Sequence, residues 1–325
     1  MQFDLALLAR ALDWLHHGWR RNAPPGTVGV HLHDPTLEIG RHLFSILRGD
    51  RADLQDFLAT PPARRLRLCV DAGRPALRWL LTLPWELLFD DTTCSFRGLD
   101  GSLSLVRSFA SSDAGPPSHH ALATGLRPTD EPLRLLLAIA SPSGQPTLDP
   151  SPTLAALRDH ALGRSLQVDV LHHATASSLR SMVRQRQPQA LHLMAHAGHD
   201  SFGAASALVL ESGQGSPEAA DAARLESLWP RSLRLVTVDS QSHDADPDPS
   251  AALGAALALS DRPLVVALQH RMAAPATTAF VRSFYGALAD REPVEIALQA
   301  ARRSVASAHS AGVTDWAAPA LYARA

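Results

Sequence analysis

The sequence predicts an α/β fold in which a mostly parallel sheet is covered by helices on both faces. Beyond residue 130, short apolar runs typical of buried strands alternate with segments whose apolar residues recur at helical spacing. A chain of 325 residues is long enough to bury a large core. Its composition, 46% hydrophobic and 19% charged, is that of an ordinary globular protein.

The chain is expected to consist of two halves joined by a linker. Residues 1–110 are predicted to form an N-terminal α/β half. Residues 111–130 are rich in Ser, Pro, Gly and His, which is typical of a linker. Residues 131–325 are then expected to form a second half that carries the functional site.

Five segments organise the N-terminal half. Helical spacing of apolar residues predicts helices over residues 3–21 and 36–58. Alternation or a short apolar run predicts strands over residues 66–71 and 103–106. Between these strands, Leu83-Pro-Trp-Glu-Leu-Leu-Phe89 forms a compact apolar segment before a turn.

The second half shows the alternation that defines the fold class. Strands are predicted over residues 135–140, 168–172, 190–195, 233–238 and 263–268, with a hairpin around 207–211. Helices are predicted over residues 153–162, 177–186, 223–228 and 251–259, and as a pair over 277–308. Strands that alternate with helices favour parallel pairing, because each helix carries the chain back across one face of the sheet.

Charge and composition exclude several classes of function. The formal net charge of −2 gives no bulk attraction to nucleic acid or to an anionic membrane. No glycine-rich phosphate loop is present, so no nucleotide or other cofactor is expected. The N-terminus has no signal-peptide pattern and no apolar run reaches about 18 residues, which predicts a cytoplasmic protein.

The sequence contains two cysteines, Cys69 and Cys94. Their number and spacing match neither a disulfide framework nor a zinc motif. Cys69 falls in the strand predicted over residues 66–71, where a thiol serves as a small core residue. Cys94 falls in a polar loop that has no histidine close in sequence.

The most informative feature is a pair of apolar strands that each end in polar residues. The first runs over residues 190–199 and places His196 at its end, and the second runs over residues 234–242. Two neighbouring strands of this kind can bring a base and a nucleophile to one cleft. The second segment contains no cysteine. It ends in Ser240 and Gln241.

Several segments of the chain resemble the CHAT domain, which belongs to the caspase-like clan of cysteine proteases together with separase and the gingipains. The segments that carry the resemblance are residues 263–269, 279–288, 297–303 and 316–322, and upstream residues 40–44 and 83–88. Their order and spacing extend it over nearly all of residues 36–325. The resemblance implies a caspase-like three-layer fold, preceded by an α/β N-terminal half.

The resemblance also implies roles for individual residues. In the family, a strand ending His-x-x-x-His-Gly supplies the catalytic histidine, which corresponds to His196, with His192 as a supporting polar group in the core. Two alignments of the next strand remain open, one with Gln241 and one with Ser240 at the position of the family's cysteine. Ala197 replaces a glycine whose backbone N–H is expected to help form the oxyanion hole.

A degenerate site follows from these positions. A glutamine amide cannot attack a carbonyl group, and a serine alkoxide is much harder to generate than a thiolate. We therefore expect a CHAT-like pseudoprotease that binds a protein or peptide partner. The family context implies a separately encoded sensor or protease in a bacterial defence or cell-death type circuit. The alternative is an active caspase-like peptidase or a weak serine hydrolase that uses His196 with Ser240.

Loops that flank the two strands are expected to bind the partner. His199, Asp244 and Asp246 favour a basic ligand, whereas Arg271 favours an acidic one. The loop that carries Asp244 and Asp246 has more charge than Arg271, which predicts a preference for Arg- or Lys-bearing peptides. The alternative is that this loop is solvated and only connects the strand to the next helix. A zinc site built from His196, His199 and His243 is less favoured than solvated side chains, so no metal is expected.

Overall fold

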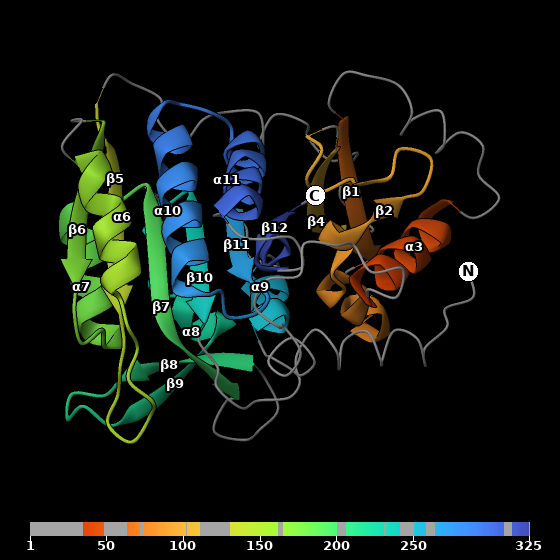
Figure 1. The fold of residues 1–325 in the computed structure, drawn as a ribbon. Coiled ribbons are helices and arrows are strands. Elements are labelled where there is room, and N and C mark those ends of the chain that lie inside the picture. Colours follow the sequence, from red (N-terminus) through yellow and green to blue (C-terminus); the bar gives the residue numbers. More distant parts are fainter. Residues whose placement is uncertain are drawn as a thin grey trace.

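A ten-stranded, mostly parallel sheet organises the protein (Figure 1). This computed structural model describes residues 35–48, 64–71, 75–101, 103–110, 131–161, 165–199, 206–230, 232–240, 250–257, 264–308 and 314–324. The helix predicted over residues 3–21 and the linker predicted over 111–130 lie outside the described residues.

The strands of the sheet come from both halves of the chain. They are β1 (Arg64–Asp71), β4 (Leu103–Ala110), β5 (Leu133–Ile139), β6 (Leu166–Leu171), β7 (Ala190–His199), β8 (Ser206–Glu211), β9 (Pro217–Asp221), β10 (Leu235–Ser240), β11 (Leu264–Leu268) and β12 (Pro319–Arg324). Their order is β1-β4-β12-β11-β10-β7-β5-β6, and β8 and β9 form a hairpin that pairs with the end of β7. Within this order β11 and β12 are antiparallel, as are β7, β8 and β9. A separate small sheet consists of β2 (Phe89–Asp90) and β3 (Ser95–Phe96).

Two hydrophobic clusters, one on each face of the sheet, form the core. The first cluster includes residues of α3 (Pro35–Arg48), α6 (Ser151–Ala161), α10 (Ala274–Ala289) and α11 (Val294–Ala308). The second includes residues of η2 (Pro75–Thr82), α7 (Ala176–Arg186), α8 (Ala222–Glu226) and α9 (Ser250–Leu257). Successive strand residues alternate between the clusters, as Leu135 and Leu136 of β5 do. The predicted α/β class, with helices on both faces of a mostly parallel sheet, is confirmed.

The predicted elements that fall on described residues are present, and some of their bounds differ. The strand predicted over 190–195 continues to His199. The helix predicted over residues 36–58 is present over Pro35–Arg48, and the rest of its range lies outside the described residues. The sequence pattern does not predict β12, because Pro319 and several alanines lack the β-branched side chains typical of strands. None of the described helices is long and apolar enough to cross a membrane.

Strand β12 joins the two halves of the sheet. It pairs in parallel with β4, with Tyr322 opposite Arg107, and antiparallel with β11, with Tyr322 opposite Val265. The strands β1 and β4 therefore extend the same sheet that contains β7 and β10. The parts of the sequence before and after the predicted linker, residues 111–130, thus contribute strands to one sheet.

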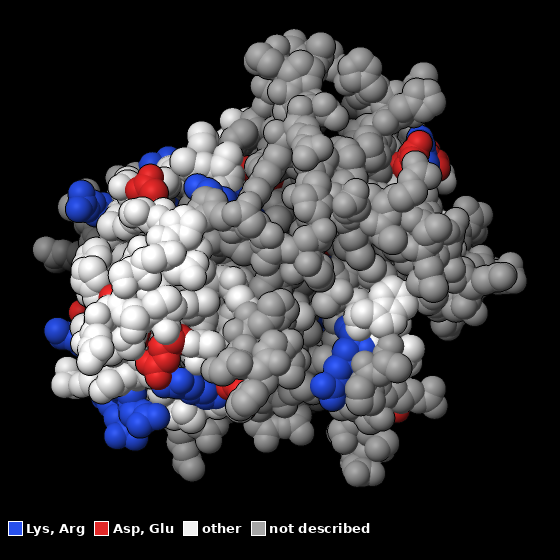
Figure 2. Space-filling model, turned by 90° about the horizontal axis from the view of Figure 1, so that it is seen from below, with Lys and Arg blue, Asp and Glu red and all other residues white. Residues whose placement is uncertain are grey.

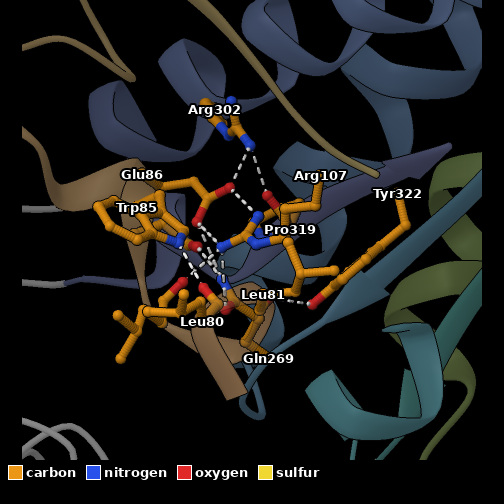
Figure 3. A network of polar contacts seen from close by, with 11 residues as sticks. Leu80, Leu81, Trp85, Glu86, Arg107, Gln269, Arg302, Pro319 and Tyr322 are labelled. Carbon is orange, nitrogen blue, oxygen red and sulfur yellow. Dashed lines mark hydrogen bonds and ion pairs between the residues drawn. The ribbon is translucent and has the colours of Figure 1, made fainter. Parts of the chain in front are cut away.

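A buried polar network reinforces this junction (Figure 3). The guanidinium of Arg107 donates to both carboxylate oxygens of Glu86, over 2.6 and 2.7 Å. Arg302 of α11 donates to the same carboxylate over 3.2 Å, and Gln269, which follows β11, donates to it over 3.1 Å. Four of the segments that carry the family resemblance, residues 83–88, 263–269, 297–303 and 316–322, contribute side chains or carbonyls to this network.

The network keeps Glu86 ionised inside the core. Burial alone would raise the pKa of the Glu86 carboxyl, but the cations and hydrogen bonds of Arg107 and Arg302 outweigh burial and lower it. Each cationic or amide side chain also donates to a backbone carbonyl: Arg107 to Leu83 over 2.7 Å, Gln269 to Ala317 over 3.3 Å and Arg302 to Pro319 over 2.6 Å. The network therefore fixes the chain immediately after β11, next to the candidate site.

Candidate functional site

The strands β7 and β10 lie side by side at the centre of the sheet. They are parallel, and their register pairs His192 with Thr237 and Ala195 with Ser240. Because the carboxyl ends of parallel strands meet at one edge of a sheet, the polar residues that end both strands lie close together. Ligand sites of α/β folds are found at this edge. The two segments singled out in the sequence are thus neighbours.

His196 is a buried and oriented imidazole. Only 3% of the residue is exposed, and its Nε2 atom lies 2.7 Å from the carbonyl oxygen of Pro146. A carbonyl oxygen only accepts, so Nε2 must donate, and the lone pair of the neutral ring is then on Nδ1. Pro146 therefore fixes the ring's orientation and tautomer, the role that a carboxylate has in a Ser-His-Asp triad. The sequence gives no sign of this partner, because any residue has a carbonyl.

Ser240 lies on the opposite face of the sheet from His196. It is fully buried and pairs with Ala195, which belongs to the second core cluster. Ser240 is also two residues beyond Val238, another member of that cluster, so its side chain points to the same face. His196 follows the alternation of Met194, which belongs to the first core cluster. The structure therefore does not bring the Ser240 hydroxyl to His196, the arrangement that the serine hydrolase alternative needs.

His192 lies in the core beneath this edge of the sheet. Its Nδ1 atom is 2.9 Å from the hydroxyl of Tyr285 on α10, which donates in turn to Thr237 over 3.0 Å. Burial raises the pKa of the Tyr285 hydroxyl, so it stays protonated. The Nε2 atom of His192 lies 3.6 Å from a carboxylate oxygen of Asp239. This group supports the ends of β7 and β10 from the side of α10.

The two cysteines lie on elements other than β7 and β10. Cys69 is on β1, and five strand steps separate β1 from β7, which at about 4.8 Å per step corresponds to roughly 24 Å. Cys94 is in the turn between β2 and β3, outside the large sheet.

Ala197 has an ordinary extended backbone. It continues β7 opposite Leu208 of β8 and does not adopt the left-handed conformation that favours glycine. Alanine thus fits this position without backbone strain, although the family motif has glycine here.

The predicted ligand-binding residues are only partly described. Gln241, Asp244 and Asp246 lie outside the described residues, and His199 is the last residue of β7, where its backbone pairs opposite Ser206. Arg271 is exposed, two residues beyond Gln269. Within the described ranges, no three His, Cys, Asp or Glu side chains are grouped in a way that could hold a metal ion.

Arg271 lies near the start of α6. The pKa of the Asp149 carboxyl is lowered, first because Ser151 donates hydrogen bonds to it and further because the Arg271 cation is close. Asp149 belongs to the same loop as Pro146. The loop that orients His196 and the loop that follows β11 therefore approach each other at this edge of the sheet.

A mostly parallel sheet covered by helices on both faces agrees with the α/β fold of the caspase-like class of proteins. The model of the CHAT domain matches residues 37–324, so the chain belongs to the CHAT domain family. No curated protein matches the chain.

Proposed function

We propose that this CHAT domain protein is a pseudopeptidase that binds a protein or peptide partner around His196 without cleaving it. The observation that carries the proposal is the placement of Ser240 on the opposite face of the sheet from the imidazole. The positions of Cys69 on β1 and Cys94 between β2 and β3 support it further. Without Ser240 or either cysteine beside it, the imidazole has none of these three groups to activate for acyl transfer.

An oriented histidine remains useful for recognition. While Nε2 stays held by Pro146, a partner group can form a hydrogen bond with the ring in exchange for the further contact that His196 makes within the chain. Such a bond contributes about 0.5–1.5 kcal/mol net, and more when one member is charged.

The partner is a polypeptide and not a nucleic acid. The face seen in Figure 2 carries arginines and carboxylates interspersed over its described part, in agreement with the net charge of −2. The family context favours a separately encoded sensor or protease in a bacterial defence or cell-death type circuit, acting in the cytoplasm.

A displayed peptide library tests this proposal. Wild-type protein is expected to retain a defined subset of peptides saturably and to release them uncleaved, as mass spectrometry of the recovered peptides shows. His196→Ala should weaken that binding by roughly three- to tenfold, the equivalent of one lost hydrogen bond. His172→Ala, a change at an exposed histidine, is the matched control. Cleavage products that disappear in His196→Ala would overturn the proposal.

A retained peptidase activity is the second candidate. The hydrogen bond from His196 to Pro146 favours it, because an oriented tautomer is what a general base requires. The burial of Ser240 on the other face argues against serine as its nucleophile.

A further inference from the structure

The carbonyl that orients His196 belongs to a loop held by the β8–β9 hairpin. The loop follows β5, and its residue Ser143 donates to the carbonyl of Gly215 twice, from its backbone N–H over 2.9 Å and from its hydroxyl over 3.0 Å. Gly215 lies in the hairpin turn with φ +78°, a conformation that favours glycine. The hairpin itself pairs with the end of β7 (Figure 1), and Val209 of β8 lies opposite His196.

A second anchor of the same loop is the carboxylate of Glu211, the last residue of β8. One oxygen accepts from the backbone N–H of Ser141 over 2.9 Å, and the other accepts from Nδ1 of His173 over 3.1 Å. The backbone N–H of Glu211 donates to the carbonyl of Ala174 over 3.0 Å. Glu211 thus ties together the segments that follow β5 and β6 and the end of β8.

The burial of Glu211 makes these two donors important. Its side chain is 6% exposed, so the carboxylate depends on protein donors in place of water. His173, in contrast, is 82% exposed and has a left-handed backbone, with φ 55°. Such a conformation is uncommon in a non-glycine residue, although histidine adopts it more often than most.

We propose that Glu211 is a positioning residue for His196. Its carboxylate holds Ser141 and hence the loop that presents the Pro146 carbonyl, and the exposed His173 is the second donor to that carboxylate. This role for Glu211 deepens the proposed function. It rests on that function in one respect, namely that His196 is the centre of the binding site. The hydrogen bonds on the path run from His173 to Glu211, from Ser141 to Glu211 and from His196 to Pro146.

Nuclear magnetic resonance of protein labelled with ¹⁵N-histidine tests the proposal in the absence of any partner. In the wild type, His196 should show the Nε2–H tautomer with an imidazole proton protected from exchange, because that proton is buried and hydrogen-bonded. Glu211→Ala should shift the His196 ring signals towards a mixture of tautomers and abolish the protection. Glu211→Gln should restore both, because its amide oxygen still accepts from Ser141.

Glu218→Ala is the matched control, since Glu218 lies in the same hairpin but pairs with Arg224 at the surface. The readout separates positioning from a general loss of structure, because the Glu211→Gln rescue and the signals of His192 report the fold independently. Should Glu211→Ala not fold, His173→Ala removes one of the two donors at an exposed position and is expected to shift the same His196 signals. Unchanged His196 signals in whichever of these variants folds would overturn the proposal. If the wild type shows the expected His196 signals but binds no peptide, the proposed function is wrong and the positioning role of Glu211 is unaffected.

Discussion

Glu86 and Arg107, 21 residues apart in sequence, form a doubly hydrogen-bonded ion pair in which neither side chain has any exposed surface. Arg302 adds a second buried cation to the same carboxylate. A single negative charge therefore compensates two guanidiniums at the junction of β4, β12 and α11. This imbalance makes Glu86 the critical member of the network.

Glu86→Gln is expected to destabilise the protein by roughly 3–5 kcal/mol, because it leaves both guanidiniums buried without a counter-charge. Chemical unfolding monitored by circular dichroism measures the loss. Glu38→Gln, at an exposed position on α3, is the control and should change stability by less than about 0.5 kcal/mol. Similar stabilities of the two variants would contradict the assigned role of Glu86.

The stability of the protein should fall in acid partly because of Glu86. Its folded-state pKa lies below the ordinary value of 4.5, so the folded state binds the proton less well than the unfolded state does. The stabilisation is complete above 4.5 and is lost as pH falls through the lowered pKa. Unfolding midpoints measured from neutral pH to below 4.5 should decline less steeply in Glu86→Gln than in the wild type. Parallel declines would show that other carboxylates account for the acid sensitivity.

Gly254→Ala should loosen the packing of α9 against the sheet. A Cβ atom at this position would lie 2.6 Å from Cβ of Ala267, which is closer than real contacts allow, and 3.1 Å from the Tyr322 ring, which is tighter than most. The expected loss is about 1–3 kcal/mol, read from thermal unfolding. Gly213→Ala, whose Cβ would meet no atom within 4 Å, serves for comparison and should cost nothing. An equally stable Gly254→Ala variant would mean that α9 shifts freely.

Thiol chemistry distinguishes the two candidate nucleophile positions. Ser240→Cys should react slowly with iodoacetamide and independently of His196, because position 240 is buried in the second core cluster. Strand alternation carried one residue further predicts that Gln241→Cys reacts faster at neutral pH, with the advantage lost on adding His196→Ala. A fluorophosphonate probe should likewise leave native Ser240 unlabelled. Fast, His196-dependent reaction at position 240 would reverse this assignment.

Charge should influence which peptides bind. We expect Arg- or Lys-bearing peptides to bind several times more tightly than neutral ones, with the preference reduced by replacing Asp244, Asp246 and Asp248 together with Asn. Raising the salt concentration should reduce it as well, because exposed charges are screened. Arg271→Gln tests the opposite contribution and should strengthen the binding of basic peptides. Indifference to all of these changes in a peptide array would remove the acidic loop from the binding site.

The sequence predicts the strands well, and with them the place of His196 near the end of β7, because strands depend on local patterns of apolar residues. It does not decide between Ser240 and Gln241, since a shift of one residue reverses the face of a strand, and only the pairing of Ser240 with Ala195 sets that face. It also misses Pro146 and Glu211. Pro146 acts through a backbone carbonyl that any residue has, and the anchoring of its loop by Glu211 arises only from long-range contacts.

The pairing of β4 with β12 has a consequence for how the chain is made. The contact of Tyr322 with the carbonyl of Leu81 joins residues 241 positions apart, so this junction forms only when almost all the described chain has been synthesised. Until then, β4 leaves the ribosome with one edge unpaired, and Arg107 lacks the hydrogen bond to Gln269, the residue that follows β11. Such an edge invites pairing with the wrong strand or with another nascent chain. Chaperone protection during translation is therefore most needed for β4, whose second neighbour in the sheet, β12, is synthesised much later.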